Sequence, residues 1–248
     1  MKKKLAVLVF ALLFLSGLVM AYGQLSRERP QPPGQSFAIS EHGTLLELFD
    51  GSGKSRFGKI VGDGFEVRYK TPGQTVAASA IGSKRRGLQG AQVELNGQSA
   101  TASAMTEDQT LEITSYFILD DNAKELTIGR KFRNVSLKPL TLEMVRAHVD
   151  QKLAVGGQPG SSKPDDVAQL PIKGSIYGPG SDCQGPMRKC SPEPCPGRTC
   201  ASLFPGKSGV ILEWKQRITL APEQQKAPAG STLLPANEAF IVIHMSLK

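Results

Sequence analysis

The segment QTLEITSYFILDDNAKELTIGRKFRNVSLKPLTLEMVRAHVD, residues 109–150, decides the fold of this chain. Apolar and polar side chains alternate in three stretches of it, residues 111–119, 126–133 and 140–145. Such alternation is typical of a half-buried β-strand, because successive side chains leave opposite faces of the sheet. The short connections between the stretches contain Asp, Asn, Ser and Pro, which favour turns. The segment therefore predicts three consecutive antiparallel strands.

Each of the three stretches has an apolar row on one face. In the first stretch, Ser115 is the only interruption of that row. The rows are Leu111, Ile113, Phe117 and Leu119 in the first stretch, Leu126, Ile128 and Phe132 in the second, and Leu140, Leu142 and Met144 in the third.

The remainder of the chain also favours strands over helices. No stretch shows a sustained helical period with a cap and a stop, and the dipeptides Asp50-Gly51 and Asn96-Gly97 are strong hairpin signals. Many short strands with regular turns predict an all-β fold, a large antiparallel two-sheet sandwich of about eleven strands. The last stretch, residues 239–247, is apolar on both faces, which predicts a strand in the middle of a sheet. Further strand candidates are residues 44–49, 65–69, 75–81, 88–95, 98–105 and 210–220.

The N-terminus has the layout of a secretory signal peptide. Three lysines precede an apolar run that ends near Met20, and small residues follow it, so cleavage is expected after Ala21 or Gly23. The alternative is an uncleaved membrane anchor, for which the run is close to the lower length limit. We expect a periplasmic or secreted protein without a stable membrane span after cleavage. A polar, proline-rich leader, residues 24–36, then precedes a single domain, residues 37–248.

Charge narrows the range of partners. The net charge is +8, and the three lysines of the signal peptide contribute three of these, which leaves +5. This mild excess of positive charge favours binding to anionic surfaces but does not by itself require such a partner. The one dense basic cluster, Lys84-Arg85-Arg86, has no interleaved aromatic residues, so nucleic acid is not an expected partner.

A segment rich in glycine, proline and cysteine interrupts the strand pattern. Residues 156–209 contain ten glycines and nine prolines, and they are expected to form a long loop insertion. Disulfides are the favoured interpretation in an exported chain, although the pairing stays open. A zinc site and free or redox-active thiols are the alternatives; the cysteine spacings lack the close pairs that zinc sites usually have. The four cysteines are Cys183, Cys190, Cys195 and Cys200.

Motifs for enzymatic chemistry are absent from the sequence. The chain has no G-x-S-x-G, no H-E-x-x-H and no phosphate-binding loop, and Gly51-Ser52-Gly53-Lys54-Ser55 is interpreted as a turn. A site built from His42, His148 and His244 is a conceivable metal centre, but partly exposed sheet histidines are the favoured interpretation. No metal or cofactor is expected.

The run from Leu126 to Leu142, followed by His148, resembles the centre of galactose-mutarotase-like proteins. Those proteins are β-supersandwiches in which an L-x-I-x-x-x-x-x-N-x-S/T-x-x-P hairpin leads to a strand that ends near a sugar-binding histidine. The resemblance implies that His148 is the acid that protonates a sugar ring oxygen, with a carboxylate opposite as base. Glu213 and Glu238 are the candidates for that base. The residues after His148, from Val149 onwards, depart from the family pattern, which favours a shared fold and carbohydrate binding over catalysis.

Three classes of function follow. The first is a non-catalytic binding module for a saccharide or a cell-envelope polymer, with Arg130, Arg146 and Trp214 as candidate ligand-binding residues. Trp214 lies on an apolar face, where core packing is the competing interpretation. The second class is a structural or assembly protein of the envelope that uses the Gly/Pro/Cys segment for contact. The third is an aldose-epimerase-like enzyme that uses His148.

Overall fold

The computed structural model describes residues 34–60, 63–75, 77–82, 86–122, 124–154, 172–181, 199–206, 209–223 and 233–247. The chain divides into two units, residues 1–32 and 33–248, and every described residue belongs to the second. The predicted signal peptide and the predicted leader up to residue 33 lie outside the described residues. So do Cys183, Cys190 and Cys195.

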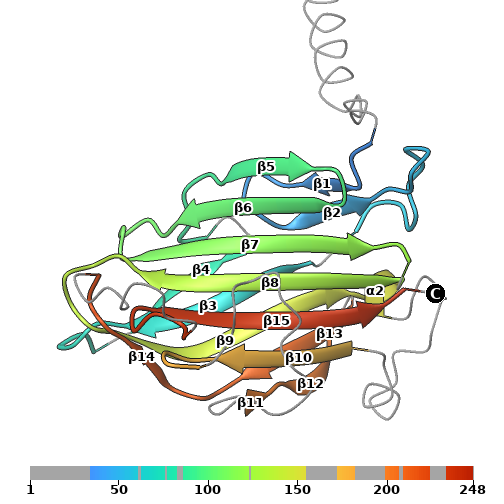
Figure 1. The fold of residues 1–248 in the computed structure, drawn as a ribbon. Coiled ribbons are helices and arrows are strands. Elements are labelled where there is room, and N and C mark those ends of the chain that lie inside the picture. The colour runs from blue at the N-terminus through green and yellow to red at the C-terminus, as the bar shows by residue number, and fades with distance from the viewer. Residues whose placement is uncertain are drawn as a thin grey trace, which may run out of the picture. The chain divides into compact units, whose positions relative to one another are not determined.

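The larger sheet has seven antiparallel strands, and the 109–150 segment provides its centre (Figure 1). The first two predicted strands form β7 and β8, which pair along their whole length as a hairpin. The strand order is β11 (Thr199–Cys200), β10 (Ile172–Tyr177), β15 (Glu238–Ser246), β8 (Glu125–Asn134), β7 (Leu111–Asp120), β6 (Ser99–Met105) and β5 (Gln92–Asn96).

The second sheet is built around the third predicted strand, which forms β9, and it lies behind the first sheet in Figure 1. The chain crosses from one sheet to the other between β8 and β9, so the prediction of three consecutive antiparallel strands is right for the first two only, and the third pairs with β3 and β13 instead. A short strand, β14 (Ile218–Leu220), also pairs with β9, and β1 (Phe37–Ile39) and β2 (Leu45–Leu48) form a separate two-stranded sheet. The order in the second sheet is β12 (Ser202–Gly206), β13 (Gly209–Trp214), β9 (Leu140–Asp150), β3 (Gly64–Lys70) and β4 (Ala78–Ile81).

One apolar core joins the inner faces of the sheets. The predicted apolar rows of β7 and β8 are buried within it, as are Phe65 and Val67 of β3. The sheets approach closely at Gly174 of β10, where a Cβ atom would lie 2.5 Å from a methyl carbon of Leu212 in β13. The structure is therefore the predicted all-β sandwich.

Two predictions about the second half of the chain have different outcomes. The prediction for the C-terminal strand is confirmed, because β15 lies between β10 and β8 and is buried on both faces. The expectation of one long loop over residues 156–209 needs correction, because β10, β11 and β12 fall within this segment. The strand β10 is short and contains Gly174, so its apolar alternation is too weak to stand out from the surrounding glycines and prolines.

Two local features complete the fold. A single helical turn, α2 (Gln151–Ala154), follows β9, and Asp150 caps it by accepting a hydrogen bond from the Lys152 backbone N–H at 2.7 Å.

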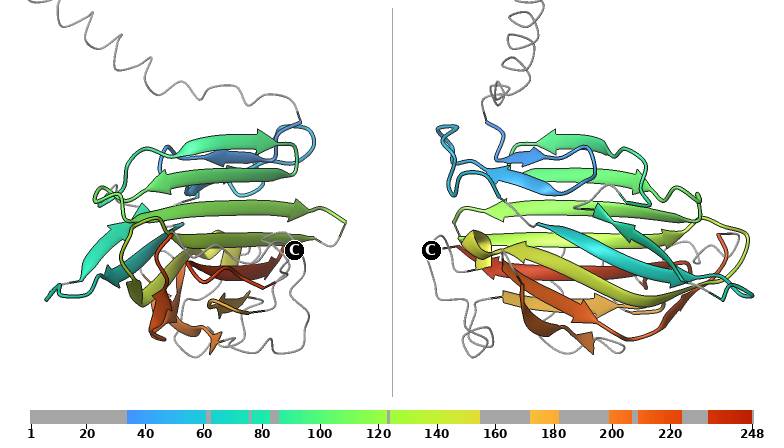
Figure 2. Two further views of the ribbon diagram at one scale, coloured as in Figure 1. Left: turned by 60° about the vertical axis from the view of Figure 1, so that its left-hand side comes forward. Right: turned by 180° about the vertical axis from the view of Figure 1, so that it is seen from behind.

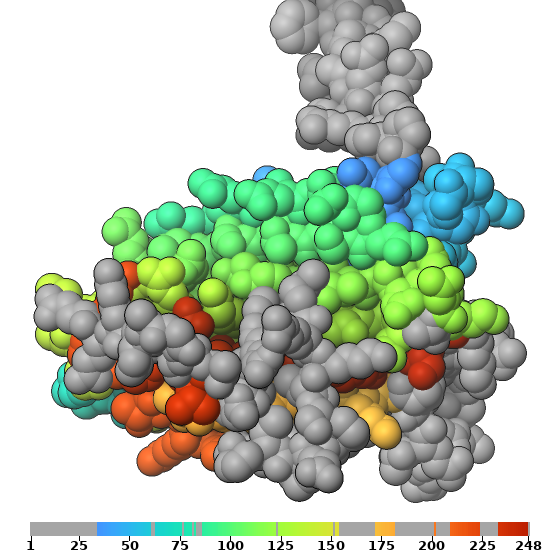
Figure 3. Space-filling model, viewed as in Figure 1, coloured from blue at the N-terminus to red at the C-terminus, as the bar shows by residue number. Residues whose placement is uncertain are grey.

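On the outer face of the seven-stranded sheet, a small apolar cluster forms around Phe240, whose ring lies over Gly129. Figure 3 views the molecule from this side, with β5 to β7 in green.

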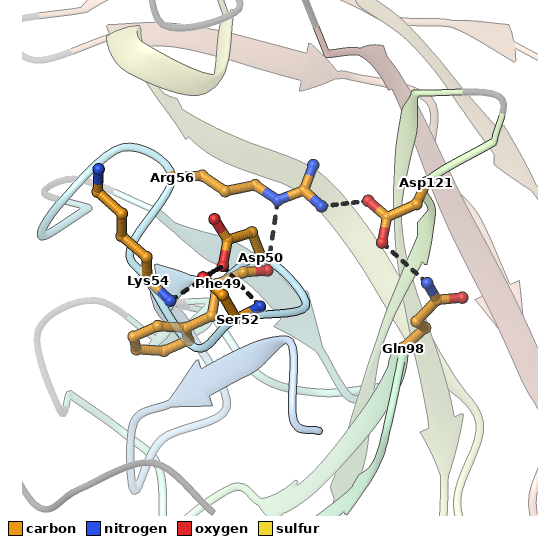
Figure 4. A network of polar contacts seen from close by, with 7 residues as sticks. All are labelled: Phe49, Asp50, Ser52, Lys54, Arg56, Gln98 and Asp121. Carbon is orange, nitrogen blue, oxygen red and sulfur yellow. Dashed lines mark hydrogen bonds and ion pairs between the residues drawn. The ribbon is translucent and has the colours of Figure 1, made fainter. Parts of the chain in front are cut away.

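Polar contacts hold three loops together at one end of the sandwich (Figure 4). Arg56, in the loop after β2, pairs with Asp121 at the tip of the β7–β8 hairpin. Asp121 also accepts a hydrogen bond from Gln98 at the tip of the β5–β6 hairpin, at 2.9 Å. Asp50 Oδ1 accepts the backbone N–H groups of Ser52 and Lys54, which confirms that the Gly-Ser-Gly-Lys-Ser run is a turn.

Candidate functional site

The outer face of the six-stranded sheet carries paired charged side chains on three adjacent strands, β3, β9 and β13, and it faces the viewer in the right-hand view of Figure 2. Strand β3 buries Phe65, Val67 and Tyr69, so the residues between them point outward. The same alternation in β9 and β13 turns further charged residues to that side. We call this surface the charged face and define it by Glu66, Arg68, Arg146, Glu213 and Lys215.

Arg146 is the centre of the charged face. The strand register places it directly between Glu66 of β3 and Glu213 of β13. Its Nε donates to Glu213 Oε2 at 2.5 Å, and its Nη1 donates to Glu66 Oε2 at 3.3 Å. One guanidinium therefore joins three strands, and its planar fork fixes both carboxylates.

Two more cations extend this row at both ends. Arg68 Nε lies 3.3 Å from Glu66 Oε1, and Lys215 Nζ lies 3.2 Å from Glu213 Oε1. The two cations are largely exposed, whereas the side chain of Glu213 is only 4 % exposed. The result is a row of alternating charge with buried carboxylates and accessible cations.

The surroundings keep the centre of this row ionised. Burial alone would raise the pKa of Glu213, but hydrogen bonds from Arg146 and Lys215 outweigh it, so the pKa is lowered. Burial would likewise lower the pKa of Arg146, but the hydrogen bond and charge of Glu213 raise it. The face therefore offers fixed charged donors and acceptors at neutral pH.

His148 lies two residues beyond Arg146 on the same face. Its neighbours in the chain, Ala147 and Val149, are buried in the core, so the imidazole points outward and is half-buried. Its register partners are Gly64 and Ile211. Glu66 and Glu213 are thus diagonal neighbours of His148 on the adjacent strands. In antiparallel sheets the backbones of such diagonal pairs are about 7–8 Å apart.

Of the two carboxylates that the family resemblance implied as a base, only one shares a face with His148. Glu213 belongs to the charged face. Glu238 lies in β15 opposite Arg133, and its carboxylate is 3.5 Å from Lys131 Nζ, on the other sheet. The structure therefore separates Glu238 from His148.

Two of the three predicted ligand-binding residues lie inside the protein. Arg130 is 0 % exposed and Trp214 is 1 % exposed, so neither side chain is available to a ligand in solvent. Arg130 occupies an inward position of β8, and Trp214 packs in the core beside Gly174. Arg146 is the one member of this set on the surface.

Among the described residues, the buried Arg130 has a single charged neighbour, Asp63. Its Nη2 lies 3.6 Å from Asp63 Oδ2, and its guanidinium stacks over the Phe65 ring at 5.1 Å. None of its three nitrogens has a hydrogen-bond partner among the described residues, and neither has Asp63 Oδ1. Burial raises the pKa of Asp63 and lowers that of Arg130, and the attraction between the two opposes both shifts.

The predicted metal residues do not form a site, and most of the predicted disulfide residues lie outside the described part of the chain. His42 follows β1, His148 is on the charged face, and His244 is on the outer side of the seven-stranded sheet, so the three are not brought together. Among the described residues no group of three His, Cys, Asp or Glu side chains could hold a metal ion. Of the four cysteines only Cys200 is described, as the last residue of β11, so the disulfide prediction lies outside the described residues.

Sequence reasoning missed Glu66, Arg68 and Lys215. Their only local signal is the outward position of Glu66 and Arg68 in an alternating strand. The pairing of β3 and β13 with β9 joins residues about 80 and 67 positions apart, which no local pattern reveals.

Comparisons with known proteins leave the family open. No family model matches the chain, and no curated protein matches it. Within the described residues no helix is both long and apolar enough to cross a membrane.

Solved structures with a similar fold include carbohydrate-active proteins. A putative aldose 1-epimerase from Escherichia coli K12 shares 9% identity, with a TM-score of 0.35, over 83% of this chain and 92% of that chain. A galactose mutarotase related enzyme from Lactobacillus acidophilus shares 10% identity, with a TM-score of 0.37, over 88% and 96%. A 4-alpha-glucanotransferase from Thermococcus litoralis shares 8%, with a TM-score of 0.37, over 85% of this chain and 36% of that chain.

These structures include the group of proteins that the sequence from Leu126 to His148 resembles. At such low identities and TM-scores the likeness says nothing about activity. The functional argument therefore depends on the charged face itself.

Proposed function

We propose that this chain is an exported, non-catalytic binding module that recognises a saccharide or cell-envelope polymer through the charged face. The single observation that carries the proposal is the position of Arg146, held by Glu66 and Glu213 from the two neighbouring strands. Export is proposed from the layout of the N-terminal residues.

The chemistry of the charged face suits sugar hydroxyls. A hydroxyl both donates and accepts hydrogen bonds, so a ring with several hydroxyls needs donors and acceptors side by side. Arg146 supplies donors and Glu66 supplies acceptors, while the nearly buried Glu213 holds Arg146 in position. Because the row is fixed by its own ion pairs, a ligand would meet it already ordered, which limits the entropy lost on binding.

Partner binding in an envelope assembly is the second candidate function. The edge strand β5 favours it, because all five of its residues are exposed and its outer edge is unpaired in the seven-stranded sheet. Val93 and Leu95 of this strand are each 37 % exposed. An exposed edge of this kind can accept a further strand from another chain.

Epimerase-like catalysis is a third candidate, favoured by the presence of His148 and Glu213 on one face. General acid–base catalysis requires both groups within hydrogen-bond reach of one substrate. Polarimetry of aldose mutarotation by the wild type and by His148→Asn tests this candidate. A rate above background that disappears in the variant would establish it; our proposal expects no such rate.

The main experiment compares two arginines that differ in location but not in local chemistry. Arg133, on the outer face of the seven-stranded sheet, also joins two carboxylates, Glu112 and Glu223, and its side chain is 36 % exposed against 33 % for Arg146. Wild type, Arg146→Gln and Arg133→Gln, each without residues 1–23, are applied to a glycan array and to insoluble polysaccharides.

We expect Arg146→Gln to lose about tenfold or more in affinity, since it removes a charged hydrogen-bond donor and loosens two carboxylates. Arg133→Gln should bind like the wild type. Equal losses in both variants, or no binding of the wild type to any saccharide, would refute the proposal.

A further inference from the structure

Long basic side chains border the charged face. Arg68 is 52 % exposed and Lys215 is 79 % exposed, although each lies near a carboxylate of the central row. Lys70 continues β3 beyond Arg68, and Arg217 is exposed in the connection from β13 to β14. We call Arg68, Lys70, Lys215 and Arg217 the basic rim.

The charges of this region do not balance. The two carboxylates of the central row are shared among three cations, namely Arg146, Arg68 and Lys215. Neither Lys70 nor Arg217 has an ion-pair partner among the described residues. With Glu143 of β9 included, the acidic side chains of this region are three: Glu66, Glu143 and Glu213. The basic side chains are five: Arg68, Lys70, Arg146, Lys215 and Arg217. The face therefore carries an excess of positive charge.

Apolar groups lie next to the rim. Met144 lies opposite Arg68 in the register and outside the main core cluster, but it is only 8 % exposed, so its side chain offers a ligand little surface. Ile211, beside His148, is half-buried on the same face. A polymer with both C–H faces and anionic groups fits this combination better than a neutral or purely ionic ligand, because each part of it meets a matching surface.

We infer that the saccharide bound by the charged face is acidic, with carboxylate or phosphate groups that pair with the basic rim. This inference rests on the proposed function, since it specifies the ligand of the same face. The central row hydrogen-bonds the hydroxyls, and the rim binds the anionic groups, for which exposed arginine and lysine are suitable partners.

The test measures binding of the chain without residues 1–23 to three immobilised polymers, a neutral glucan, a polyuronate and a phosphate-linked glycan, at low and at moderate salt. Two double variants remove the same number of charges. Arg68→Gln/Lys70→Gln acts on the rim, and Lys124→Gln/Lys173→Gln acts on exposed lysines in the β7–β8 turn and in β10 of the other sheet. Vesicles of anionic phospholipid serve as a further anionic surface.

We expect tighter binding to one of the acidic polymers than to the glucan, weaker binding at higher salt, and a loss of about tenfold in the rim variant. The polyuronate and the phosphate-linked glycan distinguish which anionic group is preferred. The Lys124/Lys173 variant should bind like the wild type.

Other results would overturn the inference in distinguishable ways. Equal affinity for neutral and acidic polymers, with the rim variant unaffected, would overturn the acidic ligand and leave saccharide binding in place. Equal losses in both double variants would show that net charge alone matters. Tighter binding to the vesicles than to any polymer would point to a membrane surface, and no binding to any polymer would remove the proposed function as well.

Discussion

The least expected residue in this protein is Arg130. It lies between Ile128 and Phe132 on the inward side of β8, a row that is otherwise apolar. Its register partner in β7 is Ser115, the residue that interrupts the apolar row of that strand. The two departures from the pattern are therefore neighbours, and Asp63 approaches them from the start of β3. The interior contains one small polar centre in place of a uniform apolar layer.

Removal of the charge of Arg130 or of Asp63 should destabilise the fold, because the remaining charged group would be buried without a partner. We predict that Arg130→Met and Asp63→Asn each lower the free energy of unfolding by about 3–5 kcal/mol. The double variant should lose less than the sum of the two, by about 1–3 kcal/mol. Urea denaturation of the four proteins gives this coupling energy. Additive losses would mean that the two residues stabilise the fold independently.

The same carboxyl makes stability depend on pH. Burial raises the pKa of Asp63 above the value of about 3.9 expected in the unfolded chain. At pH values above the pKa of Asp63 in the unfolded chain and below its raised pKa in the folded chain, the folded state holds a proton that the unfolded state has released. The free energy of unfolding therefore decreases as the pH rises from about 4. We predict that this decrease is present in the wild type and absent from Asp63→Asn. Urea midpoints measured from pH 4 to pH 7 test it, and parallel curves for the two proteins would contradict it.

At the scale of the element, strands with strong alternation could be predicted from sequence and strands without it could not. The β7–β8 hairpin, β9 and β15 follow from apolar rows within a single stretch of chain. The strand β10 was missed because the extended backbone around Gly174 is stabilised by long-range pairing, with β15 about 70 residues away and with β11 about 25 residues away. The charged face was missed for the same reason, since Glu66 and Glu213 meet Arg146 only through long-range pairing.

The close approach of β10 and β13 gives a prediction for a single strand. At Gly174 an added Cβ atom would lie 2.5 Å from Leu212 Cδ2 and 2.9 Å from Trp214 Cζ2. We expect Gly174→Ala to lower the thermal midpoint and to cost about 1–3 kcal/mol, because the sheets must separate locally. Gly178→Ala is the control, since its Cβ atom would meet nothing nearer than 3.7 Å. A variant at Gly174 as stable as this control would show that the core can repack there.

At the scale of the whole molecule, the sandwich separates stability from recognition. The inner faces of both sheets form one core, while the outer face of the six-stranded sheet has fixed charges whose ion pairs do not enter that core. Variants of the exposed cations Arg68 and Lys215 should therefore change binding with little effect on folding. Exposed ion pairs of this kind contribute only about 0–1 kcal/mol to stability.

The C-terminal strand provides the opposite case, in which one element determines whether the second compact unit folds at all. Strand β15 joins β10 to β8 and buries five large apolar side chains: Phe240, Ile241, Val242, Ile243 and Met245. At about 1.5–3 kcal/mol for each, their burial contributes roughly 7–15 kcal/mol, which is as large as the whole stability of a typical domain. We predict that a chain of residues 33–237 is unfolded, whereas residues 33–248 give a far-ultraviolet circular dichroism spectrum dominated by β-sheet. Because the shorter chain keeps every residue of the charged face, its failure to bind saccharide would show that the face depends on the completed sandwich. A folded and binding-competent shorter chain would instead mean that the six-stranded sheet is stable without this interior strand of its partner sheet.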